Sequence, residues 1–146
     1  MNGERKEEKG KKVVFQIEIK FFVMLNSAHK NLDVYKISLQ LVKEIYKLTK
    51  TFPKEEQYAL ISQLRRAAVS VCSNIAEGSC RITKPDRKRF YEISRSSLVE
   101  IDTQIEIALI LGYLKKEQIV ELESYLNSVF RMLSKMISNL SPGATK

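Results

Sequence analysis

The chain has 146 residues, 44% of them hydrophobic and 29% charged, which is the composition of a single soluble domain with one core. Two cysteines and one histidine are too few for a disulfide scaffold or a zinc site, so both are excluded. A formal net charge of +8 favours a polyanionic partner such as nucleic acid, with solubility as the alternative explanation.

Residues 1–28 are predicted to form an N-terminal extension. Residues 1–12 are polar and mixed in charge, which is typical of a disordered segment. Residues 15–21, "FQIEIKF", alternate apolar and polar side chains as a half-buried strand does. No later segment alternates in this way, so such a strand would need a partner in another chain. The second interpretation is that the segment lies upstream of the true start, with Met24 as the initiator.

This extension has neither the pattern of a leader nor that of a membrane span. Glu18 and Lys20 interrupt its apolar run, and no small-residue cleavage pattern follows. No stretch of 18 uncharged apolar residues occurs anywhere in the chain. We therefore expect a cytoplasmic protein without a membrane partner.

Two helices are predicted after the extension. From Asp33 to Phe52 the apolar residues are spaced by three or four, which gives one helical stripe. Pro53 suits the first turn of the next helix, which we expect to run from about Lys54 to Glu77 and to stop at Gly78. The two stripes consist of Val34, Ile37, Leu41, Ile45, Leu48 and Phe52, and of Ile61, Leu64, Ala68, Val71 and Ile75.

Two further helices complete the chain. Thr83, with Asp86 three positions later, predicts an N-cap for a helix that continues to about Leu111 and ends at Gly112. The fourth helix is predicted from about Ile119 to Leu140. The inward residues are Leu98, Ile101, Ile105 and Ala108 or Leu109 in the third helix, and Ile119, Leu122, Leu126, Val129, Leu133, Met136 and Leu140 in the fourth. We predict an all-α fold, an antiparallel up-down-up-down four-helix bundle over residues 29–140, with a tail over 141–146.

The stretch "RRAAVSVCSNIAEGS", residues 65–79, places polar groups within an apolar helical pattern. Its polar residues share one side of the second helix beside the apolar stripe, and we predict that they tie neighbouring helices or subunits together by hydrogen bonds. They are Ser70, Ser73, Asn74 and Glu77. Cys72 fits a small buried residue, whereas Cys80 lies in the predicted connection. A di-metal site is rejected because no Glu-x-x-His pair exists.

The same stretch carries a resemblance to a known family. The run Arg-Arg-Ala-Ala through Ser-Asn-Ile-Ala-Glu-Gly, followed by "LVEIDTQIEIALILGYL", resembles the four-helix-bundle family encoded in intervening sequences of bacterial 23S ribosomal RNA genes. The accessory variability determinant of diversity-generating retroelements is similar to that family. The resemblance spans about residues 29–140. Cys72 stands where the family usually has Pro, which predicts a straighter helix here.

The resemblance implies a homopentamer with a basic surface. It also implies a partner, because the retroelement relatives bind a reverse transcriptase and nucleic acid. A polar, small-residue stripe on a bundle helix is consistent with packing between subunits.

The positive charge is concentrated between residues 65 and 95, where eight basic residues face three acidic ones. We predict that these eight bind RNA or RNA/DNA through phosphate contacts, with a solvated charged surface as the alternative. They are Arg65, Arg66, Arg81, Lys84, Arg87, Lys88, Arg89 and Arg95. Free amides at the start of the third helix would add to the attraction for phosphate.

The predicted function is therefore a non-enzymatic, homo-oligomeric, nucleic-acid-binding bundle without a cofactor. The alternative is a protein-interaction adaptor, such as an accessory subunit of a reverse transcriptase. No nucleophile, metal or phosphate-loop pattern supports an enzyme, which would need a concealed acid–base pair such as Glu77 with Glu100.

Overall fold

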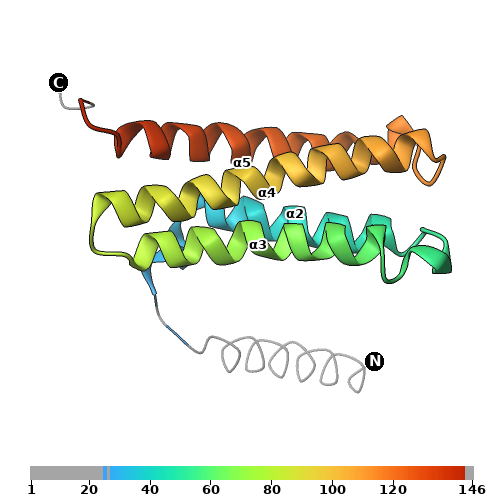
Figure 1. The fold of residues 1–146 in the computed structure, drawn as a ribbon, viewed down its shortest axis with the longest axis horizontal. Coiled ribbons are helices and arrows are strands. Elements are labelled where there is room, and N and C mark those ends of the chain that lie inside the picture. The colour runs from blue at the N-terminus through green and yellow to red at the C-terminus, as the bar shows by residue number, and fades with distance from the viewer. Residues whose placement is uncertain (1–24, 26, 144–146) are drawn as a thin grey trace, which may run out of the picture.

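Four long antiparallel helices form the fold (Figure 1). The computed structural model describes residues 25 and 27–143, and every regular element in that part is helical. The long helices are α2 (Asp33–Thr49), α3 (Leu60–Cys80), α4 (Lys84–Ile110) and α5 (Val120–Asn139), and short 3₁₀ turns precede three of them: η1 (Ala28–Asn31), η2 (Lys54–Glu56) and η3 (Lys116–Ile119). The predicted all-α four-helix bundle is confirmed. The predicted strand over residues 15–21 lies outside the described residues.

The core lies between the four helices, because each helix packs on the next and α5 closes against α2. Its largest fully buried side chains come from all four: Leu41, Ile45, Leu64, Ile75, Leu98, Ile101, Leu122 and Leu133. All eight belong to the predicted stripes. On α5, however, Ile137 is buried while the predicted Met136 is only half-buried. A straight helix drifts away from a strict seven-residue repeat, and this drift moves the buried position by one residue.

The connection between α2 and α3 is longer than predicted. α2 ends at Thr49, just before the break expected ahead of Pro53, whereas α3 begins at Leu60 rather than at about Lys54. Lys54–Glu56 forms a 3₁₀ turn, and Oε2 of Glu56 accepts a hydrogen bond of 3.1 Å from the backbone N–H of Leu60. Oε1 of the same carboxylate accepts a 3.0 Å hydrogen bond from the Tyr113 hydroxyl, which lies in the α4–α5 connection. Residues 57–59 form a turn between η2 and α3, and Ala59, the residue before α3, has a φ of −118° and a ψ of −107°, outside the helical range.

The prediction that α3 stops at Gly78 is wrong. The helix continues through Gly78 to Cys80, so Cys80 ends a helix and does not lie in the connection. Gly78 is buried against α4, and a Cβ at this position would lie 2.7 Å from Cε1 of Tyr91. The glycine therefore serves close packing of two helices rather than helix termination.

The predicted boundaries of α4 are confirmed. The Thr83 hydroxyl accepts a 3.3 Å hydrogen bond from the backbone N–H of Asp86, and Gly112 follows the helix with a φ of 74°. This left-handed conformation favours glycine, as expected for a residue just past a helix end. Among the helices described, none combines the length and the hydropathy needed to cross a membrane.

Candidate nucleic-acid interface

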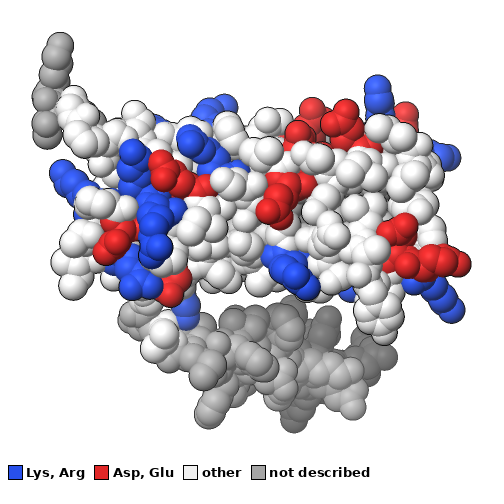
Figure 2. Space-filling model, in the orientation of Figure 1, with Lys and Arg blue, Asp and Glu red and all other residues white. Residues whose placement is uncertain are grey.

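Five of the predicted cations lie together where α3 is joined to α4. We call this cluster the basic end, and it consists of Arg81, Lys84, Arg87, Lys88 and Arg89. Figure 2 shows Lys and Arg side chains gathered at that end of the bundle. The cluster forms because α3 ends at Cys80 and α4 begins at Lys84, so a short connection and one helical turn or two carry all five residues.

Phe90 organises the arginines of the basic end. The guanidinium carbons of Arg81 and Arg89 lie 4.6 and 4.9 Å from the centre of its ring. Such stacking holds a guanidinium in place while its outward N–H groups remain available. In addition, Nε of Arg87 donates a 2.6 Å hydrogen bond to the carbonyl oxygen of Arg81, which ties the first turns of α4 to the connection.

The basic end is only partly neutralised by acids. Arg81 pairs with Glu77 at 3.3 Å, and Lys88 lies 3.8 Å from Glu92. The first pair is exposed and the second is half-exposed, so both contribute little to stability. Lys84, Arg87 and Arg89 have no ion-pair partner in the part of the chain that the structure describes.

The start of α4 offers less to an anion than the sequence indicated. Pro85 has no N–H, and the N–H of Asp86 is already bonded to the Thr83 hydroxyl. The Asp86 carboxylate also places a negative charge in the first turn. Binding of phosphate at the basic end would therefore depend on side-chain cations and not on backbone amides.

A hollow of about 490 Å³ adjoins the basic end. Lys84, Pro85 and Lys88 of α4 line one side, and the segment 139–143 at the end of α5 lines the other. The two lysine side chains bring positive charge to this concave surface, where a phosphate group would be partly shielded from water.

Arg95 lies farther along α4 and contacts α5. Its guanidinium carbon is 5.9 Å from the centre of the Phe130 ring, and Nη1 donates a 3.4 Å hydrogen bond to the Ser134 hydroxyl. The residue is half-buried, so its contacts between helices occupy part of its charged group.

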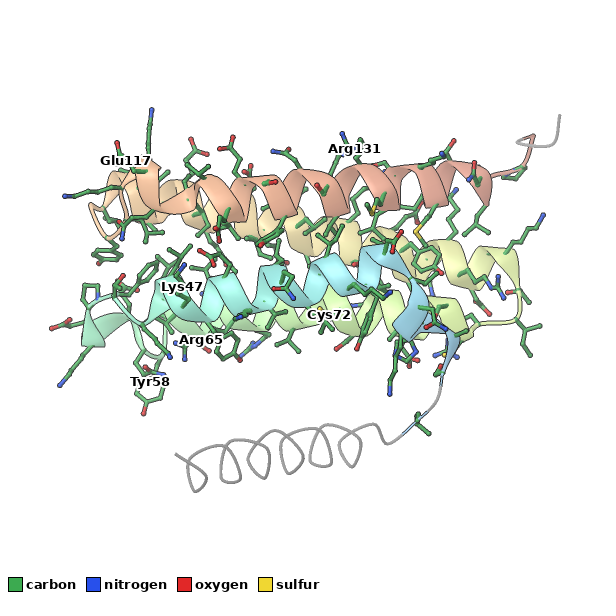
Figure 3. The ribbon with its side chains drawn as sticks, turned by 180° about the vertical axis from the view of Figure 1, so that it is seen from behind. Lys47, Tyr58, Arg65, Cys72, Glu117 and Arg131 are labelled. Carbon is green, nitrogen blue, oxygen red and sulfur yellow. The ribbon has the colours of Figure 1, made fainter. Side chains whose placement is uncertain are left out.

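Arg65 and Arg66 do not join the other predicted cations. They lie about 24 Å from Arg81 along the axis of α3. Nε of Arg65 donates a 2.9 Å hydrogen bond to the Thr49 hydroxyl, and the guanidinium stacks on Tyr46 at 4.6 Å. Figure 3 shows Arg65 in the half of the bundle that contains Glu117, away from the basic end. Arg65 therefore links α3 to α2.

The four polar residues predicted to tie α3 to its neighbours do not all do so. The Ser70 hydroxyl lies 3.0 Å from that of Ser97 and so connects α3 to α4, while Asn74 donates to the carbonyl oxygen and hydroxyl of Ser70 on its own helix. Ser73 is exposed, and Glu77 pairs with Arg81. No signal in the sequence indicated a buried hydrogen bond between α4 and α3, in which the hydroxyl of Ser94 donates to the carbonyl oxygen of Val71 at 2.8 Å.

Two groups near these contacts have altered acidity. Burial raises the pKa of the Cys72 thiol, which donates a 3.1 Å hydrogen bond to the Ser38 hydroxyl. Burial also raises the pKa of Tyr91, an effect that the positive charge of Arg87 partly opposes. Both groups therefore keep their protons to a higher pH than they would in water.

Glu77 and Glu100, the carboxylates that an acid–base site would need, are not brought together. Ser70 faces Ser97, Glu77 follows on one side of that contact and Glu100 on the other, so about 15 Å separates them along the helix axes. No acid–base pair is formed by these two groups.

Comparison with solved structures identifies a protein with the same fold. A crystal structure of a protein of unknown function from the S23 ribosomal protein family of Bacteroides thetaiotaomicron superimposes with a TM-score of 0.66. The two sequences are 21% identical, and the match covers 72% of this chain and 95% of the other. Among curated proteins, no match is found.

The sequence model described as "23S rRNA-intervening sequence protein" matches residues 30–135, which include all four long helices except the last turn of α5. The stretch over residues 65–78, whose residues suggested this family, lies inside the match. The chain belongs to the 23S rRNA-intervening sequence protein family.

Proposed function

We propose that this protein is a non-enzymatic homo-oligomer that holds RNA or an RNA–DNA intermediate by phosphate contacts at its basic end. The observation that carries the proposal is the cluster of five cations, of which Lys84, Arg87 and Arg89 have no acidic partner among the described residues. Arginine, with its planar fork of donors, suits phosphate oxygens. Because no base-reading motif is recognised, the expected sequence preference is weak.

Self-association is supported by the outer side of α4. Ile93, Val99 and Ile107 are 42%, 53% and 42% exposed, although α4 also buries apolar residues in the core. A helix that is apolar on two sides is typically covered on both. Near these residues, Oε1 of Gln104 is buried without a hydrogen-bond donor in the described part of the chain. The number of five subunits comes from the family resemblance, and a ring of copies would add the fields of their basic ends.

The first experiment measures binding of a fluorescent single-stranded RNA at two salt concentrations, with the mass of the same sample from light scattering. We expect a pentamer whose affinity for RNA falls steeply with salt, because counterions are released from the phosphates on binding. A pentamer that does not bind RNA would overturn the nucleic-acid function and leave the charge as a contribution to solubility.

A triple variant tests the assignment of the site. Replacing Arg87, Lys88 and Arg89 by Ala should weaken RNA binding and reduce the slope of log affinity against log salt by about 2. The matched control replaces Lys43, Lys50 and Lys54 by Ala, which removes the same charge from exposed positions outside the basic end. Equal losses in the two triple variants would mean that net charge, and not the basic end, determines binding.

The alternative function, an adaptor such as a reverse-transcriptase accessory subunit, makes a different prediction. An adaptor would form the same oligomer without binding RNA independently. The light-scattering and RNA-binding measurements therefore distinguish the two functions.

A further inference from the structure

A second surface lies between α4 and α5 in the half of the bundle away from the basic end. It is a hollow of about 290 Å³, which we call the α4–α5 groove. Its apolar lining consists of Ile105, Leu109, Ile119, Leu122 and Leu126. Ile105 and Leu122 are buried, whereas the other three side chains remain half-buried and accessible from the hollow.

Three exposed carboxylates also line the α4–α5 groove: Asp102 and Glu106 on α4, and Glu123 on α5. None of them has an ion-pair partner within residues 27–143. The combination of an apolar lining with unpaired negative charge excludes nucleic acid as the ligand, because phosphates would be repelled. It is complementary to a segment that combines apolar side chains with lysine or arginine.

The dimensions of the groove suit a short helix. Its lining runs over residues 102–109 of α4 and 119–127 of α5, a length of about 12 Å, which corresponds to two helical turns. Two neighbouring helices that present an apolar trough are the usual receptor for an amphipathic helix with anchors one turn apart. A volume of 290 Å³ is at the small end for a pocket that encloses a small molecule.

We propose that the α4–α5 groove binds a cationic amphipathic helix of a partner protein. Apolar anchors of that helix enter the hollow between Leu109 and Leu126, and its lysine or arginine side chains pair with Asp102, Glu106 and Glu123. Because the groove and the basic end lie in opposite halves of the bundle, a helix bound in the groove leaves the basic end uncovered. This inference does not depend on the proposed nucleic-acid function.

The test uses the full chain and a fluorescent, end-capped, 14-residue peptide of leucine and lysine arranged as an amphipathic helix. We expect the peptide to bind, and the variant Asp102→Asn/Glu106→Gln/Glu123→Gln to bind it about tenfold more weakly, because three exposed ion pairs together account for about one factor of ten. The control Asp33→Asn/Glu55→Gln/Asp86→Asn removes the same charge from exposed positions outside the groove and should retain the affinity of the unmodified chain.

A second measurement locates the peptide without any substitution. Methyl NMR shifts on peptide addition should be confined to the groove, at Leu109, Leu122 and Leu126. Three results would overturn the proposal: no binding by the unmodified chain, equal losses in the two triple variants, or methyl shifts elsewhere. A change in oligomeric mass on neutralising the three groove carboxylates would also overturn it, because the groove would then be occupied by a second copy.

Discussion

The basic end and the α4–α5 groove differ in charge although both are built on α4. Residues 81–95 contain six basic and two acidic residues, whereas residues 100–123 contain six acidic and two basic ones. The side of α4 that faces the core is buried along both halves of the helix, at Tyr91, Leu98 and Ile105. The inward residues of α4 therefore determine the fold. The outward residues of the same helix vary independently of them, and they determine the sign of the charge that each half presents to a ligand.

The largest expected effect comes from a substitution at the middle of α4, where both halves share the core. Leu98 is fully buried, so Leu98→Ala should lower the free energy of unfolding by about 2–5 kcal/mol. Urea unfolding followed by circular dichroism measures this loss. The exposed Lys43 on α2 provides the control, and Lys43→Ala should change stability by less than about 0.5 kcal/mol. Similar losses for the two variants would contradict the described packing of α4.

A substitution at Gly78 should affect the basic half specifically. Side-chain atoms added there would meet the ring of Tyr91, so Gly78→Val should lower the free energy of unfolding by about 1–3 kcal/mol. A double-mutant cycle with Tyr91→Ala provides the check. If the close approach of α3 and α4 is the cause, the double variant loses less stability than the sum of the two single variants. Additive losses would argue against it.

Arg65→Ala tests whether Arg65 stabilises the bundle, in contrast to the cations of the basic end, which we propose bind RNA. Loss of the hydrogen bond to Thr49 and of the stacking on Tyr46 should lower the free energy of unfolding by about 1 kcal/mol, with RNA affinity unchanged. The neighbouring Arg66 is exposed, so Arg66→Ala serves as the control and should leave the melting temperature unchanged. If Arg65→Ala lost RNA affinity while its stability stayed constant, Arg65 would instead be a nucleic-acid contact.

The smallest effect concerns pH and the two cysteines. Because burial raises the pKa of Cys72, the folded state binds its proton more tightly than the unfolded state. This contribution is fully present below the ordinary thiol pKa and is lost as pH rises towards the raised value, so stability should decline above about pH 8.5. The decline should be shallower in Cys72→Ala.

A separate experiment distinguishes the two cysteines by their exposure. Iodoacetamide should modify the exposed Cys80 first, and rapid modification of Cys72 in the folded chain would contradict its burial.

Helix formation could be predicted from the sequence because the apolar residues of all four helices follow the helical period. The missed boundaries depend on partners distant in the chain. Just before the late start of α3, Glu56 is bonded to Tyr113, which is 57 positions away. Gly78 resembled a helix end because glycine is common there, and only the position of Tyr91 shows why it lies within the helix.

The candidate site could be predicted in part. Arg81, Lys84, Arg87, Lys88 and Arg89 are close in sequence, and a short connection keeps them close in space. Arg65 belongs to the same charged stretch, yet its surroundings come from Thr49 and Tyr46 of α2, which local sequence does not specify. The α4–α5 groove joins residues from two helices and had no signal in either one.

Glu56 has a consequence for the dynamics of the end of the bundle opposite the basic end. One carboxylate oxygen accepts from the start of α3 and the other from Tyr113, so two connections are held by a single side chain. Segments joined in this way open and close as one cooperative unit, and their amide protons should exchange with solvent at similar rates. Glu56→Ala would release both connections together and make each exchange independently, while the amides of the Leu98 region would stay protected.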